Sequence, residues 1–201
     1  MKRVELTQLL ADAALLKQFY DDLDNGAVAI IPTDTLYGFA VAAHMPVAVA
    51  RIYQIKNRDA QKPLILFLEQ IEQLRQTGFE LPLPLMQRLQ QYWPGALTAI
   101  LHKPGHSDIS AFTFDKIGVR IPAHRQLLQF LAGYQHKLLT TSANRSGAPS
   151  DSDPEQLAAE FSSEVDWLLD DGVLSPSLPS TVADFTVVPP VILRQGGLKL
   201  L

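Results

Sequence analysis

Two patterns of apolar residues follow one another along the chain: short continuous apolar runs, and apolar positions spaced as on one face of a helix. Residues 27–31 and 64–68 are uninterrupted apolar runs, and the structure-breaking residues Gly26 and Pro63 stand directly ahead of them. Runs of this length between such breakers are typical of buried strands. The same pattern predicts further strands at 97–101, 117–122, 137–141 and 165–169.

Apolar positions spaced three and four residues apart predict the helices. One long stripe predicts a single helix that starts at a Thr7 cap and ends at Asn25-Gly26. Pro46 opens a second helix, because proline is favoured at the first helical position. The Asp153-Pro154 pair marks another helix start for the same reason. Apolar spacing predicts shorter helices around 71–74, 85–92 and 127–133.

The order of these elements predicts the fold class. Helices and strands alternate first, and segments 179–185 and 191–194 then form a late antiparallel pair. We therefore expect an α/β fold, a single-domain twisted mixed sheet with flanking helices. The 201 residues contain no repeat, no low-complexity tract and no interdomain linker, so residues 1–201 are predicted to form one domain.

Composition and charge narrow the class of protein. The chain has a formal net charge of -4 with 17 Lys and Arg, so it is not basic overall, although a local basic groove remains open. It contains no Cys, which excludes disulfides, thiolate catalysis and Cys-ligated zinc. The first residues lack the apolar core of a signal peptide, and no apolar run is long enough to span a bilayer. We expect a soluble, cytoplasmic protein without a membrane partner.

Polar clusters follow or interrupt the predicted strands. They are the segments 32–38 (PTDTLYG), 56–62 and 142–146, and Ser180-Thr181 together with Arg194. In open α/β sheets, ligands bind at the carboxyl ends of strands. Arg120 is a further candidate, because an arginine between apolar strand residues needs an anionic partner or a groove to face.

Each cluster also has a purely structural interpretation. The loop 32–38 is equally compatible with a polar turn that caps the next element. Lys56 and Arg58 are compatible with a solvated helix end, segment 142–146 with a simple turn, and Arg194 with an ion pair to Asp184. Taken together, the basic side chains and hydroxyl loops favour a site for phosphate and carboxylate groups.

Several standard sites are excluded or disfavoured. The sequence contains neither GxxxxGK[ST] nor GxGxxG, so it has neither a P-loop nor a dinucleotide fingerprint. It has no GxSxG elbow, which disfavours a serine hydrolase. The five histidines show no HExxH spacing, so we expect no metal site formed by protein side chains.

At this point the motifs resemble a known family, the YrdC-like threonylcarbamoyl-AMP synthases. The matching segments appear in the family's order from about Gly26 to Gly196. They are PTDTLYG after a strand, KNR followed by KP, GVRIP, TTSANRSG, and PSTV followed by Arg-x-Gly. Several independent motifs in order are far more specific than any one alone. The chain ends at Leu201, so it resembles the short, single-domain form.

The resemblance implies a fold, a reaction and partners. The fold would be YrdC-like, with a concave basic face. The reaction would condense L-threonine, bicarbonate or CO₂, and ATP with Mg²⁺ to threonylcarbamoyl-AMP and pyrophosphate. The product would feed N6-threonylcarbamoyladenosine formation at position 37 of tRNA, with threonylcarbamoyl-transferase proteins acting downstream.

The resemblance also implies site residues. No side chain resembles a covalent nucleophile or a general base, and Lys56 and Arg58 would act electrostatically on the phosphates. The ATP-binding candidates are Lys56, Arg58, Lys62, Lys116, Ser142, Asn144, Ser152 and Arg194. The threonine-binding candidates are Thr33, Thr35, Arg120, Ser142 and Ser180. Many longer relatives carry a His where this chain has Phe67, so its threonine pocket is expected to differ there.

Two other functions remain open from sequence. The same basic face could bind tRNA or double-stranded RNA as an RNA-binding module, although aromatic residues are only 8% of the chain and no RRM or KH signature is present. An inactive paralogue of the same fold is the second alternative. The chain keeps Ser142 and Asn144, which the inactive branch has lost, and this argues against that alternative.

Overall fold

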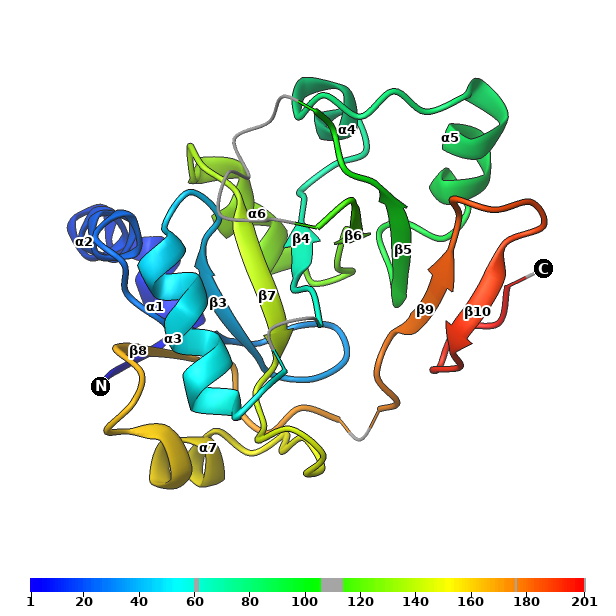
Figure 1. Cartoon of the computed structure of the whole chain (residues 1–201). Coiled ribbons are helices and arrows are strands. Elements are labelled where there is room, and N and C mark those ends of the chain that lie inside the picture. The colour runs from blue at the N-terminus through cyan, green and yellow to red at the C-terminus, as the bar shows by residue number, and fades with distance from the viewer. Residues whose placement is uncertain (60–61, 106–113, 176, 201) are drawn as a thin grey trace.

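A mixed ten-stranded sheet runs through the part of the chain that the structure describes. The structure is a computed structural model, and it describes residues 1–59, 62–105, 114–175 and 177–200. The strand order is β1-β8-β2-β3-β7-β4-β6-β5-β9-β10 (Figure 1). The strands are β1 (Lys2–Glu5), β2 (Ala29–Ile31), β3 (Gly38–Ala42), β4 (Ile65–Phe67), β5 (Leu97–His102), β6 (Lys116–Arg120), β7 (Leu138–Ser142), β8 (Trp167–Asp170), β9 (Thr181–Asp184) and β10 (Val191–Arg194).

Strand directions confirm the α/β fold with a mixed sheet. Parallel pairs join β1 to β8, β2 to β8, β4 to β6 and β5 to β9. Antiparallel pairs join β2 to β3, β3 to β7, β4 to β7, β5 to β6 and β9 to β10. The predicted late antiparallel pair is β9 with β10, and it forms one end of the sheet.

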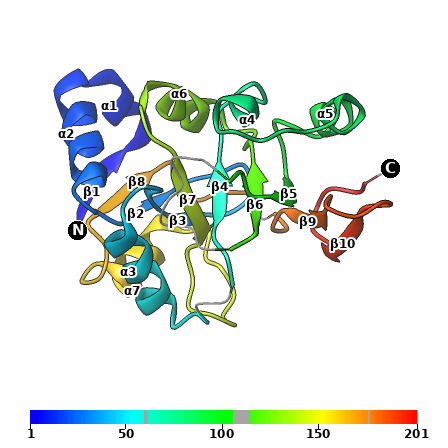
Figure 2. The same cartoon turned by 45° about the horizontal axis from the view of Figure 1, so that its top comes forward.

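Helices flank the sheet on both faces. They are α1 (Leu6–Ala11), α2 (Ala13–Asp24), α3 (Pro46–Lys56), α4 (Gln73–Gln76), α5 (Leu83–Gln90), α6 (Arg125–Gly133) and α7 (Pro154–Phe161). Helices α1, α2 and α6 lie on one side of the central strands, and α3 and α7 lie on the other (Figure 2). None of the helices in the described ranges is long and apolar enough to cross a membrane.

The period-two alternation of a strand divides the core into two clusters. In β3, Phe39 and Val41 join the cluster that contains the apolar side chains of α3 and α7. The intervening Ala40 and Ala42 join the cluster that contains those of α1, α2 and α6. All five residues of β3 are buried. This strand therefore belongs to the centre of the sheet and holds the loop that precedes it in place.

Two predicted elements differ from the structure. The single helix expected from Thr7 is two helices, because Asp12 has an extended backbone and its carboxylate accepts hydrogen bonds from the first turn of α2. Thr7 is therefore the second residue of α1 and not a cap. Strands β1 and β3 were not predicted. The Gly and Ala residues of β3 gave it little strand propensity in the sequence.

Gly38 shows why β3 begins with so small a residue. A Cβ atom at this position would lie 2.9 Å from the carbonyl oxygen of Thr141 on β7. Only glycine allows this close approach of the two backbones. Residues 60 and 61 of segment 56–62 lie outside the described part of the chain.

The two N-cap carboxylates at positions 5 and 12 provide a matched test of helix capping. Asp12 accepts hydrogen bonds of 3.0 Å from the amides of Ala14 and Leu15, whereas Glu5 makes no side-chain cap bond to α1. We expect Asp12→Ala to lower the free energy of unfolding by about 1 kcal/mol in urea denaturation. Glu5→Ala is the control and should change it by less than about 0.5 kcal/mol. Equal losses in both variants would contradict the capping role of Asp12.

Candidate active site

The buried ammonium of Lys56 joins two of the sequence motifs. Lys56 is the last residue of α3, and only 1% of its surface is exposed. Its Nζ donates hydrogen bonds to the carbonyl oxygen of Ser142 at 2.5 Å, and to the carbonyl and Oδ1 oxygens of Asn144 at 2.8 and 2.9 Å. An ammonium has three donors, and these three oxygens match them. Ser142 Oγ also donates to Asn144 Oδ1 at 2.6 Å, so the three side chains form one hydrogen-bonded cluster.

Backbone geometry brings this cluster together. Asn57 adopts a left-handed conformation with φ 48°, which ends α3 directly after Lys56. The amide of Ser146 donates to the carbonyl of Lys56 at 2.8 Å and fastens the loop after β7 to the same helix end. Burial, together with the smaller effect of the positive charge of Arg58, lowers the pKa of Lys56 to about 7.

Arg120 connects the sheet to the loop 32–38. The guanidinium donates to Asp34 Oδ1 at 2.6 Å, to Thr35 Oγ1 at 3.1 Å and to the carbonyl of Gly95 at 3.2 Å. Only 5% of the Arg120 side chain and 12% of the Asp34 side chain are exposed. Burial lowers the pKa of Arg120, while the charge of Asp34 opposes that change. Phe67 is its cross-strand neighbour, with the guanidinium 6.0 Å from the ring centre.

Hydroxyl groups shape the loop next to Arg120. Thr33 Oγ1 accepts from the amides of Thr35 and Leu36 and lies 3.1 Å from Thr35 Oγ1. The hydroxyl of Ser177 donates to the carbonyl of Thr35, so the segment that precedes β9 passes this loop. Tyr37 is fully buried and bonds to the backbone of Gly172, which makes it a structural residue of the loop.

Arg194 and Arg58 place two more guanidinium groups in the same region. Arg194 donates twice to the carbonyl of Ser180, at 2.9 and 3.2 Å, and once to Ser180 Oγ. Arg58 donates to the carbonyls of Lys62 and Pro63. The charge of Arg194 adds to burial in lowering the pKa of both Arg58 and Arg120. Arg194 is therefore within electrostatic range of both Arg58 and Arg120.

The structure does not bring all the predicted residues into these contacts. Lys116 forms an ion pair of 3.0 Å with Asp184, at the end of β6 opposite to Arg120. Ser152 contacts the amide of Leu174 through its backbone carbonyl. Lys62 is exposed, and its backbone carbonyl accepts hydrogen bonds from Arg58 and Tyr53.

Three residues join the site without having been assigned a role from sequence. They are Asp34, Thr98 and Ser177. Asp34 could have been found, because it stands inside the PTDTLYG loop between the two threonine candidates. Thr98 gave no signal, since a strand threonine is common, but its hydroxyl lies 2.9 Å from Ser180 Oγ. Ser177 follows a proline in a loop, and nothing in its neighbourhood marks it.

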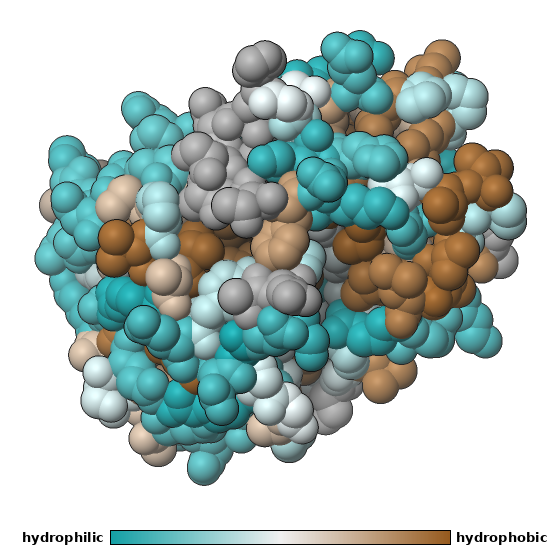
Figure 3. All heavy atoms as spheres, viewed as in Figure 1, coloured by the Kyte–Doolittle hydropathy of each residue, from teal (hydrophilic) through white to brown (hydrophobic). Residues whose placement is uncertain are grey.

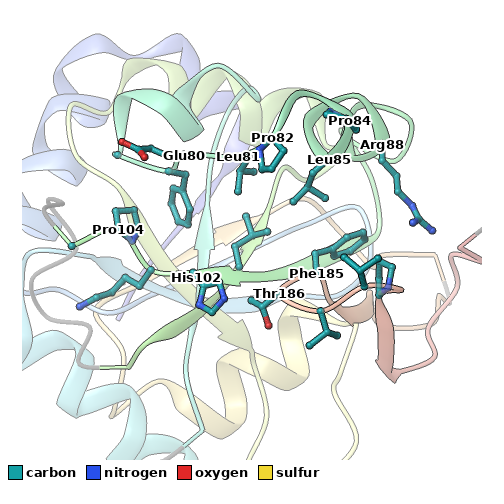
Figure 4. Close-up of a pocket in the computed structure, with 18 residues that line it drawn as sticks. Glu80, Leu81, Pro82, Pro84, Leu85, Arg88, His102, Pro104, Phe185 and Thr186 are labelled. Carbon is teal, nitrogen blue, oxygen red and sulfur yellow. The ribbon is translucent and has the colours of Figure 1, made fainter.

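A separate apolar groove lies at the other side of the molecule. It has a volume of about 900 Å³ and is lined by residues of the α4–α5 region, the end of β5 and the β9–β10 loop, among them Leu81, Leu85, Phe185 and Val187 (Figure 4). Val191 and Leu193 are exposed apolar residues of the neighbouring strand β10. The space-filling view shows a hydrophobic patch, drawn in brown, over the β9–β10 end of the molecule (Figure 3). None of the candidate site residues lines the groove.

Comparisons with known proteins agree with the fold and these motifs. The Sua5/YciO/YrdC family model, described as "Telomere recombination", matches residues 21–196. The chain belongs to this family of α/β proteins. The match includes every residue of the arginine and Lys56 clusters described above.

Individual relatives are threonylcarbamoyl-AMP synthases. The enzyme of Pyrococcus abyssi is 35% identical over 177 residues, which cover 88% of this chain and 52% of that protein. The enzyme of Nitrosococcus oceani is 30% identical, over 80% of this chain and 87% of that protein. The crystal structure of P. abyssi Sua5 complexed with L-threonine superimposes with a TM-score of 0.83 at 32% identity, covering 93% of this chain and 55% of that one. The chain thus spans about half the length of the Pyrococcus protein.

The lowered pKa of Lys56 predicts a pH dependence of stability. Its pKa is about 7 in the folded chain and 10.5 in the unfolded reference, so between these values the unfolded chain binds more protons. The free energy of unfolding should therefore rise with pH from about 7 towards 9.5, by up to ~1.4 kcal/mol per pH unit from this group. Urea denaturation across this range measures the slope.

Lys56→Met should abolish this contribution, leaving a flatter profile. Lys17→Met is the matched control, because it removes an exposed lysine that pairs with Asp21 far from the cluster. A profile in Lys56→Met identical to that of the wild type would refute the assignment to Lys56.

Proposed function

We propose that the chain is a threonylcarbamoyl-AMP synthase, which condenses L-threonine, bicarbonate or CO₂, and ATP to threonylcarbamoyl-AMP and pyrophosphate. One observation carries the proposal: the guanidinium of Arg194 lies within electrostatic range of both Arg58 and Arg120. Positive charges repel, so such an arrangement is suited to an anionic ligand that lies between them. The names of the relatives supply the identity of that ligand.

The threonine end of the site would be built around Arg120. Three of its five N–H groups are engaged by Asp34, Thr35 and Gly95, which leaves two for a substrate carboxylate. Asp34 would receive the ammonium of the amino acid, because its carboxylate is already held beside the same guanidinium. Ser180, which Thr98 and Arg194 hold in place, would contact the substrate from the opposite side. The complex of the related Pyrococcus protein with L-threonine supports this assignment.

The phosphate end would be built around Arg58 and Arg194. Both guanidinium groups are fixed by backbone carbonyls, so their charge is held in position before ATP binds. Lys56 would act differently, because its three protons already bond to Ser142 and Asn144. It would hold the Ser-x-Asn loop in shape for the nucleotide. Mg²⁺ would enter with the phosphates of ATP.

The chemistry then needs positioning and charge, without a covalent nucleophile. The ammonium of threonine first loses one proton to water, its amine then attacks CO₂, and loss of a second proton to water gives the carbamate. A carbamate oxygen attacks the α-phosphorus of ATP, and the bond from that phosphorus to the bridging oxygen of the β-phosphate breaks. Pyrophosphate leaves with its charge neutralised by Arg58 and Arg194. The mixed anhydride that remains would be consumed by a transferase that acts on tRNA.

Pyrophosphate release tests this function directly. The purified chain should release pyrophosphate from ATP and Mg²⁺ only when both L-threonine and bicarbonate are present. Chromatography of the reaction should show threonylcarbamoyl-AMP in equal amount. A sample that is folded by circular dichroism but shows no threonine-dependent release would refute the proposal. Salt-sensitive retention of tRNA by that inactive sample would then favour the RNA-binding function.

Arg58 provides the sharpest test of the phosphate end. Arg58→Ala should lower kcat/KM by about 30- to 1000-fold, because it removes a charged contact worth roughly 2–4 kcal/mol in the transition state. The control is Arg75→Ala, an exposed arginine of α4 outside the site, which should retain activity. Both variants should unfold at the same urea concentration as the wild type within error. Full activity of Arg58→Ala would show that Arg58 does not contact the reacting phosphates.

A further inference from the structure

A carboxylate and two imidazoles meet at the end of β3 and β7 that lies opposite to Ser142. Asp24 is the last residue of α2, His44 follows β3, and His136 precedes β7. Each offers one ligand atom, and these atoms all lie within 4.8 Å of one another. We propose that this cluster binds a divalent transition-metal ion such as Zn²⁺. The sequence gave no sign of it, because three separate elements supply the ligands.

The backbone fixes the two imidazoles side by side. Ala42 pairs with Leu138 in the antiparallel ladder, and the amide of Ala43 donates to the carbonyl of Lys137 at 2.8 Å. Continuing this register by two residues places His44 directly opposite His136. Directly opposed residues of two strands have neighbouring side chains on one face. The two ring centres are indeed 4.2 Å apart.

The distances to the carboxylate suit a shared ion better than direct hydrogen bonds. His44 Nε2 lies 3.7 Å from Asp24 Oδ1, and His136 Nε2 lies 3.9 Å from Asp24 Oδ2. Both distances exceed the ~2.7–3.2 Å of an N–H···O hydrogen bond. Two ligands bound at ~2.0–2.1 Å to one tetrahedral zinc ion are about 3.4 Å apart. Because the three ligand atoms lie within 4.8 Å of one another, side-chain movements of up to about 1.4 Å would bring all three onto one ion.

One ring nitrogen of His44 makes no hydrogen bond to the described residues. Its Nδ1 is buried, and no hydrogen-bond partner for it exists among the described residues. Its Nε2 faces only the distant carboxylate of Asp24 and the ring of His136. A buried polar atom without a partner costs free energy. Coordination through Nε2 would give that nitrogen a strong polar contact, while Nδ1 would carry the ring proton and stay without a partner.

The surroundings of Asp24 favour a bound cation. Tyr134 donates its hydroxyl to Asp24 Oδ1 at 2.5 Å, which fixes the carboxylate and turns Oδ2 towards His136. Hydrogen bonds of this kind orient metal ligands and raise the affinity of the site. Asp24 also stands at the C-terminal end of the twelve-residue helix α2, where the helix dipole favours positive charge. Two imidazoles and one carboxylate suit Zn²⁺, Ni²⁺ or Cu²⁺ and not Mg²⁺.

Zinc titration of the full chain tests the proposal. The protein is prepared without a polyhistidine tag, treated with EDTA and dialysed, and Zn²⁺ is titrated by calorimetry. We expect one ion per chain and a rise in the melting temperature when Zn²⁺ is added. Co²⁺ should give visible absorption bands typical of nitrogen and oxygen ligands. Mg²⁺ should produce neither effect.

Variants separate this cluster from other histidines. His44→Gln and His136→Gln should each weaken Zn²⁺ binding at least tenfold and abolish the Co²⁺ bands. His136 is exposed, so its variant should fold even if the half-buried His44 variant does not. His102→Gln is the matched control, an exposed histidine at the end of β5, and should bind as the wild type does. Absence of binding at millimolar Zn²⁺, or unchanged binding in His136→Gln, would overturn the proposal.

Discussion

The buried ammonium of Lys56 is the contact on which the rest of the candidate site depends. A charge that is removed from water is costly unless every proton finds an acceptor. Lys56 meets this condition through Ser142 and Asn144 alone, which are 86 and 88 residues away in sequence. The same three bonds fix the end of α3 against the end of β7. These bonds therefore fasten the Ser-x-Asn loop to the end of α3.

The arginines around this loop follow a related principle. Arg58 and Arg194 are held by backbone carbonyls, and Arg120 is held by one carbonyl, one hydroxyl and the carboxylate of Asp34. Carbonyl oxygens orient a guanidinium without neutralising it. The field of Arg58 and Arg194 is thus preserved for a ligand, whereas that of Arg120 is partly balanced by Asp34. This difference fits the proposed site, in which one end binds the strongly anionic phosphates and the other end binds a zwitterion.

The local pattern of the sequence was sufficient to predict some helices and strands but not others. The apolar run 27–31 was predictable, because the strand within it, β2, is fully buried. The late pair β9–β10 was also predicted, although all four residues of β10 are exposed. Strand β3 was not, since close packing against Thr141 requires glycine and thereby removes the strand signal. The break at Asp12 was hidden by an apolar stripe that continues through it. Motif order supplied the candidate residues, but the pairing of Arg120 with Asp34 is a long-range contact that no local pattern records.

The β3–β7 ladder links the two clusters that the fold assembles. Five residue pairs, from Gly38 with Ser142 to Ala42 with Leu138, separate the Lys56 cluster from the Asp24, His44 and His136 cluster. At about 3.4 Å per residue the ladder spans roughly 14 Å. An ion bound at the histidine end would fasten α2 to both strands. Because Ser142 is the last residue of β7, the same fastening would limit the motion of the strand end from which the Ser-x-Asn loop departs.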